Sequence, residues 1–181
     1  MNVRMVRLSE EHLELVMNWR MRPDITKYMN TDPKLTLDMQ KNWYRKIKDD
    51  DTQIHWVILM DEKPIGVLNI VDIDRKNSKC SWGYYVAELS ARSLKLALNL
   101  EWSLYDYVLG DMGLNKLYCE TFVLNKQVVK LHLMCGSKED GIMRSHIKKN
   151  DEFFDVSISS ILKEEWDAKK TELSFERFSF E

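Results

Sequence analysis

The sequence predicts an α/β (α+β) fold in which helices flank one mixed, mostly antiparallel central sheet. Short runs of β-branched and aromatic residues with a period of two, typical of strands, occur between stretches with helical periodicity of apolar residues. The order of these segments along the 181 residues is β-α-α-β-β-β-α-β-α-β-β. The late β-α-β unit predicts one parallel crossover within an otherwise antiparallel sheet.

The N-terminal half is predicted to supply a strand, two helices and a hairpin. Residues 3–8 alternate like a strand, and Ser9 is suited to cap the helix that follows. Pro23 ends that helix in a loop rich in charged and aromatic groups, and Thr36 caps a second helix. The runs "HWVILM" and "PIGVLNIVDI" then predict two strands joined by a turn at "DEK".

The C-terminal half begins with a third hairpin strand, "NSKCSWGYYVA". A central helix over Glu88–Leu109 follows, is ended by Gly110 and Gly113, and has an ordinary core face over Leu94–Tyr107. After a strand at "NKLYCETFVL", Asn125 begins a helix. The remainder predicts an antiparallel strand pair that turns at "KKNDE", and a terminal helix at "KEEWDAKK".

The composition indicates one globular domain over residues 1–181, because 44% of the residues are hydrophobic and 31% are charged. A formal net charge of -2 gives no reason to expect nucleic acid or an anionic membrane as a partner. No apolar run has the length of a bilayer span, and the N-terminus lacks the apolar core of a signal peptide. We therefore expect a cytoplasmic protein.

The cysteines Cys80, Cys119 and Cys135 lie far apart, which is typical of reduced thiols rather than of a disulfide framework. His132 and Cys135 form one H-x-x-C pair, and no second pair with ligand spacing accompanies it. The sequence therefore predicts no metal site.

The stretch "NKLYCETFVLNKQVVKLHLMCGSKEDGIMRSHI" resembles the second half of the GNAT (GCN5-related N-acetyltransferase) superfamily. In that family a strand ends in an asparagine, a Tyr or His follows seven residues later, and "GF…EG…R" comes next. The matching positions here are Asn125, His132, Gly136, Gly141 and Arg144. The resemblance covers nearly the whole chain and implies the GNAT fold and acetyl transfer from acetyl-CoA.

Two further stretches suggest the acceptor. "NWRMRPDITKYM" resembles the "WRNHPDI…M" signature of nucleotide-linked amino-sugar N-acetyltransferases, and "LEWSLYDYVLGDMGLNKLYCETF" resembles enzymes of pseudaminic acid biosynthesis. The resemblance implies acetylation of the 4-amino group of UDP-4-amino-4,6-dideoxy-N-acetyl-β-L-altrosamine. The substrate-binding residues it implies are Arg20, Asp24, Tyr28, Met29 and Tyr85.

Within that set, the guanidinium of Arg20 suits a diphosphate, and Tyr28 and Met29 are placed to flank the base or sugar. The alternative is a plain surface loop anchored in the core by Trp19, with Tyr85 packed within "WGYY".

Acetyl transfer to an amine requires a neutral amine, a polarised carbonyl and a stabilised leaving thiolate. The resemblance places His132 beside the thioester sulfur, where an imidazole could protonate the thiolate. Glu120 could accept the proton of the attacking ammonium, and alternation puts it on one strand face with Tyr118 and Phe122. The alternatives are a partly buried histidine and a merely solvent-exposed glutamate.

The family opens its central helix with (Q/R)-x-x-G-x-(G/A), whose backbone amides hold the cofactor pyrophosphate at a helix N-terminus. On "ARSLKLA" the glycine position is Lys95, which fits only if its φ is negative. A second departure is "CGS" in place of "GF", which removes an aromatic wall. Asn125 is expected to bond the pantetheine arm or to cap its helix. The acetyl-CoA contacts expected are Tyr85, Val86, Ala87, Arg92, Ser93, Leu94, Lys95, Leu96, Ala97, Asn125 and His132.

Three functions stay open at this point. The first is a UDP-amino-sugar N-acetyltransferase, with a small-molecule partner and room for a homodimer. The second is an acetyltransferase of protein N-termini, because "DEFFDVSISSILKEEW" resembles the tail of the ribosomal-protein enzymes. The third is a catalytically weak GNAT-fold binding protein, which Lys95 and Ser137 allow.

Overall fold

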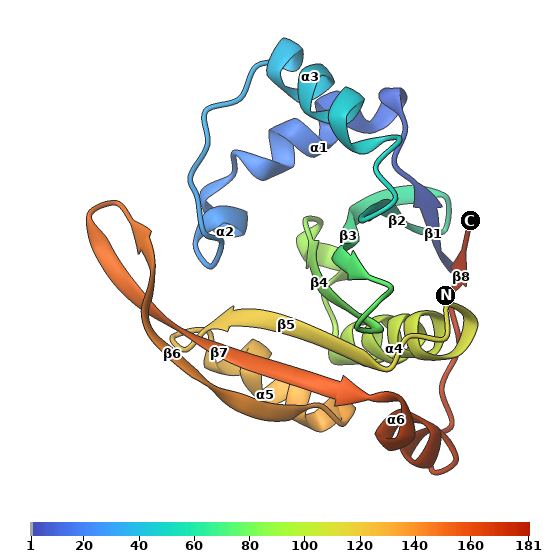
Figure 1. Ribbon diagram of the computed structural model, residues 1–181. Helices are drawn as coiled ribbons and strands as arrows, with labels where there is room; N and C mark the ends of the chain where they lie inside the picture. The colour runs from blue at the N-terminus through green and yellow to red at the C-terminus, as the bar shows by residue number, and fades with distance from the viewer. Residues whose placement is uncertain (1) are drawn as a thin grey trace.

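The structure, a computed structural model, describes residues 2–181 and joins its strands in one sheet of order β6-β7-β5-β4-β3-β2-β1-β8 (Figure 1). The strands are β1 (Val3–Arg7), β2 (Ile54–Met60), β3 (Lys63–Asp74), β4 (Lys79–Val86), β5 (Lys116–Phe122), β6 (Lys138–Lys149), β7 (Glu152–Leu162) and β8 (Ser179–Phe180). Only β4–β5 and β1–β8 pair in parallel within this sheet. The predicted mixed, mostly antiparallel sheet is confirmed, whereas β8 was not predicted.

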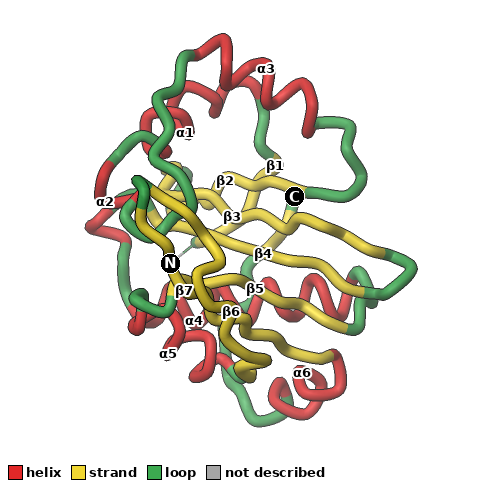
Figure 2. Tube along the Cα trace, turned by 60° about the vertical axis from the view of Figure 1, so that its left-hand side comes forward, coloured by secondary structure: helices red, strands yellow, loops and turns green. Residues whose placement is uncertain are grey.

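Helices cover both faces of the sheet. They are η1 (Glu10–His12), α1 (Leu13–Arg20), α2 (Pro23–Thr26), α3 (Leu37–Ile47), η2 (Leu89–Ala91), α4 (Leu94–Tyr105), the π-helical η3 (Asp106–Asp111), α5 (Lys126–Cys135) and α6 (Lys163–Lys170). Figures 1 and 2 show α1 and α3 on one side and α4, α5 and α6 on the other. Each side has its own apolar core. No helix between residues 2 and 181 is long and apolar enough to cross a membrane.

Local chemistry explains several element boundaries. The β2–β3 turn consists of Asp61 and Glu62, whose φ angles of 49° and 66° match the primed turns that suit hairpins. Thr36 caps α3 by accepting the N–H of Met39 at 3.3 Å, as predicted. Gly136 ends α5 with a φ of 111°, a conformation that favours glycine.

The central helix departs from its prediction. Glu101, Ser103 and Asp106 are buried polar residues, so the face expected to be ordinary core is not purely apolar. The hydroxyl of Ser103 accepts the N–H of Phe178 at 2.9 Å, and Asp106 accepts the indole N–H of Trp166 at 3.2 Å. These bonds fix the C-terminal segment against the helix, while Glu101 belongs to the site described below.

The parallel strands β4 and β5 separate partway along their length. Their pairing runs only from Lys79↔Lys116 to Ser81↔Tyr118, although β4 continues to Val86 and β5 to Phe122. Beyond that point β3 still holds β4, and β7 still holds β5. The sheet therefore opens between β4 and β5, as the two ribbons show in Figure 1.

Candidate active site

The opening between the strands presents different residues to the two faces of the sheet. On β4, Tyr84 packs with the core under α4, whereas Tyr85 packs with the core under α1. On β5, Cys119 and Thr121 are buried while Glu120 between them is exposed. Period-two alternation thus puts Glu120 on the opposite side of the strand from Thr121.

His132 lies on α5 with only 3% of its surface exposed. Its Nδ1 is 3.0 and 3.1 Å from the two carboxylate oxygens of Glu101, and its Nε2 is 3.3 Å from Oγ1 of Thr121. The edge of the Trp82 ring packs against the imidazole with 5.1 Å between centroids. Glu101, Thr121 and Trp82 therefore contact the ring from three sides. Of these, Thr121 belongs to the part of β5 that is no longer paired with β4.

The protonation of His132 follows from these neighbours. Burial lowers the pKa of His132, but hydrogen bonds to Cys119 and Glu101 and the negative charge of Glu101 outweigh burial and raise the pKa to about 10. These neighbours favour the protonated, imidazolium form of the ring. Because Nδ1–H donates to Glu101, Nε2–H is the donor on the side of Thr121.

Glu101 on α4 is fully buried, and sequence reasoning missed it. Its carboxylate accepts hydrogen bonds from the hydroxyls of Tyr105 at 3.0 Å and Tyr84 at 3.4 Å, besides the imidazole of His132. The one available signal was a carboxylate between Leu100 and Trp102 in an apolar helix. A charge in that position requires a buried partner.

Ser137, which replaces the aromatic residue of the family pattern, joins the same network. Its hydroxyl is 2.9 Å from the hydroxyl of Tyr105, and its side chain is buried. The substitution thus extends a hydrogen-bonded network behind His132 instead of leaving a gap.

Glu120 faces the other side of the sheet. Its carboxylate is 3.9 Å from Nε2 of His146 on β6, and both side chains are 39% exposed. A carboxylate in contact with water can exchange a proton with solvent after accepting it from an amine. The predicted face for Glu120 is confirmed, and its role as a base stays a prediction.

The first turn of α4 suits a pyrophosphate without any glycine. Ser93 caps the helix, since its Oγ accepts the N–H of Leu96 at 3.2 Å and its carbonyl accepts that of Ala97 at 3.1 Å. The amides of Leu94 and Lys95 are at the open helix end, where no intrahelical acceptor exists. Lys95 is helical and is not among the positive-φ residues of 2–181, so its Cβ causes no backbone strain.

Arg92 and Asp24 join this turn to α2, a short helix where the sequence predicted a loop. Arg92 Nε donates to the carbonyl of Val86 at 2.8 Å, and its Nη2 donates to Asp24 at 3.2 Å. Asp24 also accepts two hydrogen bonds from Arg22, at 3.0 and 2.9 Å. Asp24, expected to contact the acceptor, thus bridges two arginines, and the hydrogen bond from Arg22 and then that from Arg92 lower its pKa.

The structure places the other residues expected at the acceptor in different surroundings. Arg20 lies near Tyr85 and donates to the carbonyl and hydroxyl oxygens of Thr31, at 3.3 and 2.9 Å. The hydroxyl of Tyr85 is buried and has no hydrogen-bond partner among residues 2–181. Met29 packs into the α1 core, and Tyr28 is 41% exposed.

Asn125 precedes α5 as predicted, but its side chain makes no capping hydrogen bond. Its backbone carbonyl accepts hydrogen bonds from the N–H groups of Val128 and Val129 instead. The side-chain amide of Asn125 therefore remains available to a ligand. The three-donor clusters that a metal ion requires do not occur among residues 2–181.

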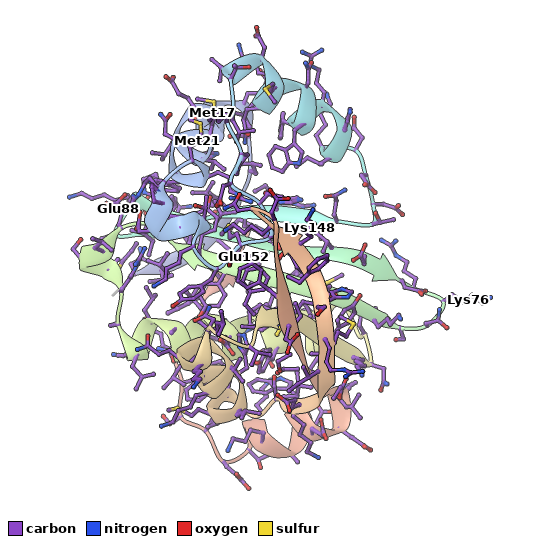
Figure 3. All side chains as sticks on the ribbon, turned by 90° about the vertical axis from the view of Figure 1, so that its left-hand side faces the viewer. Met17, Met21, Lys76, Glu88, Lys148 and Glu152 are labelled. Atoms are coloured by element: carbon purple, nitrogen blue, oxygen red, sulfur yellow. The ribbon has the colours of Figure 1, made fainter. Side chains whose placement is uncertain are left out.

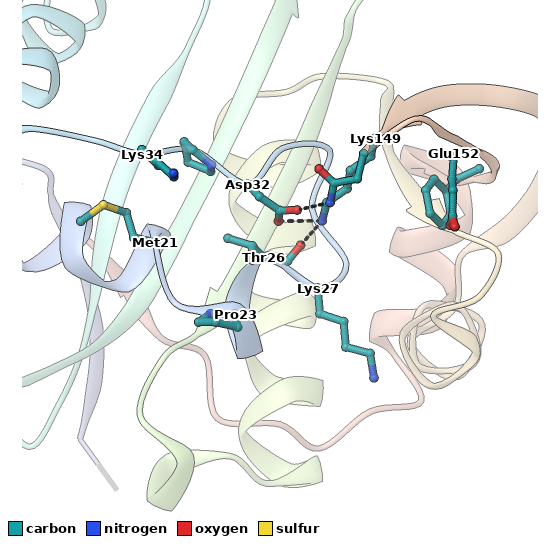
Figure 4. Close-up of a pocket in the computed structure, with 11 residues that line it drawn as sticks. Met21, Pro23, Thr26, Lys27, Asp32, Lys34, Lys149 and Glu152 are labelled. Carbon is teal, nitrogen blue, oxygen red and sulfur yellow. Dashed lines mark hydrogen bonds and ion pairs between the residues drawn. The ribbon is translucent and has the colours of Figure 1, made fainter.

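A cavity of about 720 Å³ lies beneath the α1–α3 segment (Figure 4). Nζ of Lys149 is 2.9 Å from Asp32 and 2.7 Å from the carbonyl of Thr26, so the β6–β7 hairpin closes one wall. In Figure 3 the hairpin residues Lys148 and Glu152 lie below Met21 of the helical layer. The cavity is lined by Met21, Pro23, Thr26, Lys27, Asp32, Pro33, Lys34, Lys149, Asn150, Glu152 and Phe154.

Two stacked aromatic rings connect the wall of the cavity to the end of β5. Phe154 lines the cavity and stacks on Phe122 at the end of β5, with 5.2 Å between centroids. A ligand in the cavity would therefore be next to the end of β5, two residues from Glu120.

Known proteins share this architecture. The profile of the Acetyltransferase (GNAT) domain matches residues 2–138. Acetyltransferase PseH of Campylobacter jejuni is 25% identical over 125 residues, which are 69% of this chain and 76% of that protein. An uncharacterized N-acetyltransferase, p20 of Bacillus licheniformis, is 21% identical over 165 residues, or 88% of this chain and 92% of that one.

Among solved structures, the spermidine N-acetyltransferase of Vibrio cholerae in complex with CoA and spermine superposes with a TM-score of 0.85. The two chains are 20% identical, and the match covers 91% of this chain and 98% of the other. This likeness shows the fold. The profile match and the acetyltransferase relatives lead to one conclusion: the chain belongs to the GNAT family and is an acetyl-CoA-dependent N-acetyltransferase.

Proposed function

We propose that the protein transfers the acetyl group of acetyl-CoA to the 4-amino group of a UDP-linked amino-dideoxy sugar. The observation that carries this proposal is the charge of the cavity beside the opening. Three lysines, Lys27, Lys34 and Lys149, line it against the carboxylates of Asp32 and Glu152. Lys149 and Asn150 already engage Asp32, and they lower its pKa to about 2.

A lysine-rich cavity suits the diphosphate of a nucleotide sugar, because ammonium groups bind phosphate oxygens as point charges. The same lining has no excess of carboxylates that would hold a polyamine. The likeness to acetyltransferase PseH and the "WRMRPDI" loop also support a sugar acceptor.

The two candidate catalytic groups divide the proton transfers between the faces of the sheet. Glu120 accepts the proton of the sugar ammonium from the side of the cavity, which makes the amine nucleophilic. His132, on the side of α5, donates a proton to the sulfur as the bond from the acetyl carbon to sulfur breaks and the bond to nitrogen forms. Each group lies where burial or exposure favours its task, since His132 is 3% exposed and the Glu120 side chain 39%.

Thiol release tests the acceptor class directly. The purified protein with acetyl-CoA is offered UDP-4-amino-4,6-dideoxy-N-acetyl-β-L-altrosamine, spermidine or peptides with free N-termini. We expect release only with the nucleotide sugar. A faster reaction with spermidine or a peptide would overturn the proposal, and binding of acetyl-CoA without turnover on any acceptor would indicate a binding protein.

A matched pair of lysine variants tests the cavity. Lys34→Met should raise the KM for the nucleotide sugar about three- to tenfold by removing a phosphate contact, with kcat retained. Lys76→Met is the control, because Lys76 is exposed at the distal β3–β4 turn (Figure 3). Equal KM values for the two variants would place the nucleotide elsewhere.

A further inference from the structure

We propose that Glu101 is a positioning residue for acetyl transfer, which holds the imidazole of His132 with Nε2 toward the opening between β4 and β5. The carboxylate does not itself reach the opening, because it is fully buried behind His132. The inference rests on the proposed role of His132 as the acid, and it does not depend on which amine is the acceptor.

The Glu101–His132 pair contacts both β4 and β5, at the same number of residues beyond their last paired positions. The last paired residues are Ser81 of β4 and Tyr118 of β5. Three positions further along each strand lie Tyr84, whose hydroxyl is 3.4 Å from Glu101, and Thr121, whose hydroxyl is 3.3 Å from His132. The Glu101–His132 pair thus lies across the opening just beyond the last paired residues.

The surroundings of Glu101 explain how a carboxylate can be buried there. It accepts hydrogen bonds from His132, Tyr105 and Tyr84, so its oxygens are satisfied without water. A buried carboxylate without these donors would be strongly disfavoured.

The other titratable groups around the pair come from every packed element. They are Tyr84 of β4, Tyr105 of α4, Cys119 of β5 and Cys135 of α5. Burial first, and then the charge of Glu101, raises the pKa values of Tyr84, Tyr105 and Cys135, so these three remain neutral. Cys119 and Glu101 are the two groups that raise the pKa of His132, and the carboxylate of Glu101 is the one in direct contact with Nδ1.

This arrangement determines which nitrogen of His132 reacts. Nδ1–H stays bonded to Glu101 throughout, and the proton that passes to the sulfur leaves from Nε2. A neutral imidazole remains after the step, with its Nδ1–H still donated to the carboxylate. The carboxylate neither gains nor loses a proton, in the manner of the acid that orients the histidine of a catalytic triad.

Glu101→Gln tests the positioning role. The amide is similar in size but uncharged, so we expect kcat to fall at least tenfold while the KM for acetyl-CoA changes less than threefold. The alkaline limb of the pH–kcat profile should move to lower pH, because the imidazolium loses its counter-charge. Asp106→Asn is the matched control, since Asp106 is another buried carboxylate of the same continuous helical segment, bonded to Trp166 rather than to His132.

Nitrogen NMR of the His132 ring provides a readout without any acceptor. We expect a doubly protonated ring in the wild type throughout neutral pH, and a ring that titrates at lower pH in Glu101→Gln. A wild-type ring that titrates near pH 6.5, or equal titration and equal kcat in both proteins, would overturn the inference. If Glu101→Gln does not fold, Glu101→Asp, which keeps the charge, replaces it as the variant. The titration of the wild-type ring then still tests the inference.

The two proposals fail separately. Absence of turnover on the nucleotide sugar with an imidazolium at His132 would count against the acceptor alone. Turnover that is unchanged in Glu101→Gln would count against the positioning role alone.

Discussion

A carboxylate oxygen of Asp24 lies 3.2 Å from Nη2 of Arg92 and joins α2 to the turn that opens α4. Both side chains are about 40% exposed, so the ion pair itself contributes little to stability. Its interest is functional, because one partner belongs to the expected acceptor loop and the other to the pyrophosphate turn.

Asp24→Asn should affect the two substrates in opposite directions. Arg92 keeps its bond to Val86 but loses a competing carboxylate, so we expect acetyl-CoA to bind about two- to fivefold more tightly. The KM for the acceptor should rise because the loop is less firmly held. Calorimetry and steady-state kinetics measure the two effects, with the exposed Asp38→Asn as control. Weaker acetyl-CoA binding in Asp24→Asn would show that the bridge, not free Arg92, serves the cofactor.

Lys95 replaces the family glycine and is predicted to assist the pyrophosphate. Lys95→Met preserves the helix but removes the charge, so acetyl-CoA should bind about two- to fivefold more weakly, or ~0.5–1 kcal/mol. The difference should vanish at high salt, where exposed charges are screened. Lys95→Arg should bind like the wild type. If Lys95→Met binds more tightly, the lysine obstructs the site.

Gly66 and Gly83 offer a paired test of the strand geometry beside the opening. A Cβ at Gly66 would lie 2.1 Å from the carbonyl oxygen of Tyr85. Gly66→Ala should therefore displace the end of β4, lower the Tm and weaken acetyl-CoA binding together. A Cβ at Gly83 would meet only Oδ1 of Asn69, at 3.6 Å, so Gly83→Ala should fold normally. Similar melting temperatures for the two variants would contradict this geometry.

His55, which is partly buried, and His132, which is buried, should make the free energy of unfolding depend on pH with opposite slopes. Burial, reinforced by the charge of Arg7, lowers the pKa of His55 to about 4 from 6.5, so stability falls as pH drops through that window. The raised pKa of His132, about 10, makes its contribution complete below pH 6.5, and the contribution is lost as pH rises toward 10. We expect maximal unfolding free energy near pH 6.5 in urea titrations, and a flatter acid side in His55→Gln. Stability that increases from pH 7 to 9 would be incompatible with a charged His132.

The sequence predicted the parts of this protein that depend on local pattern. The Thr36 cap, the turn at Asp61 and Glu62, and the strand alternation around Glu120 all follow from short-range rules, and the structure confirms them. The acetyl-transfer family could likewise be recognised from the Asn125–His132 spacing, because a motif on one helix survives divergence elsewhere.

The features that the sequence did not predict depend on contacts between distant segments. Glu101 and His132 are 31 positions apart, and nothing in helical periodicity indicates that they meet. The strand β8 has only two residues, and its partner β1 is about 175 positions away in the sequence, as the Arg4↔Ser179 pair shows. Asp24 is expected at the acceptor from the sequence, whereas the structure places its carboxylate beside Arg92, 68 positions away.

The buried Glu101–His132 pair also constrains how this site can change over generations. Replacement of either residue alone leaves a buried charge without its partner, which typically costs about 3–5 kcal/mol and is enough to unfold many domains. A tyrosine at position 132, which the family pattern allows, would leave Glu101 without the imidazole, so we expect it together with a neutral residue at position 101. Among relatives that retain the histidine, we expect an acid at position 101, so the two positions should be inherited as a unit.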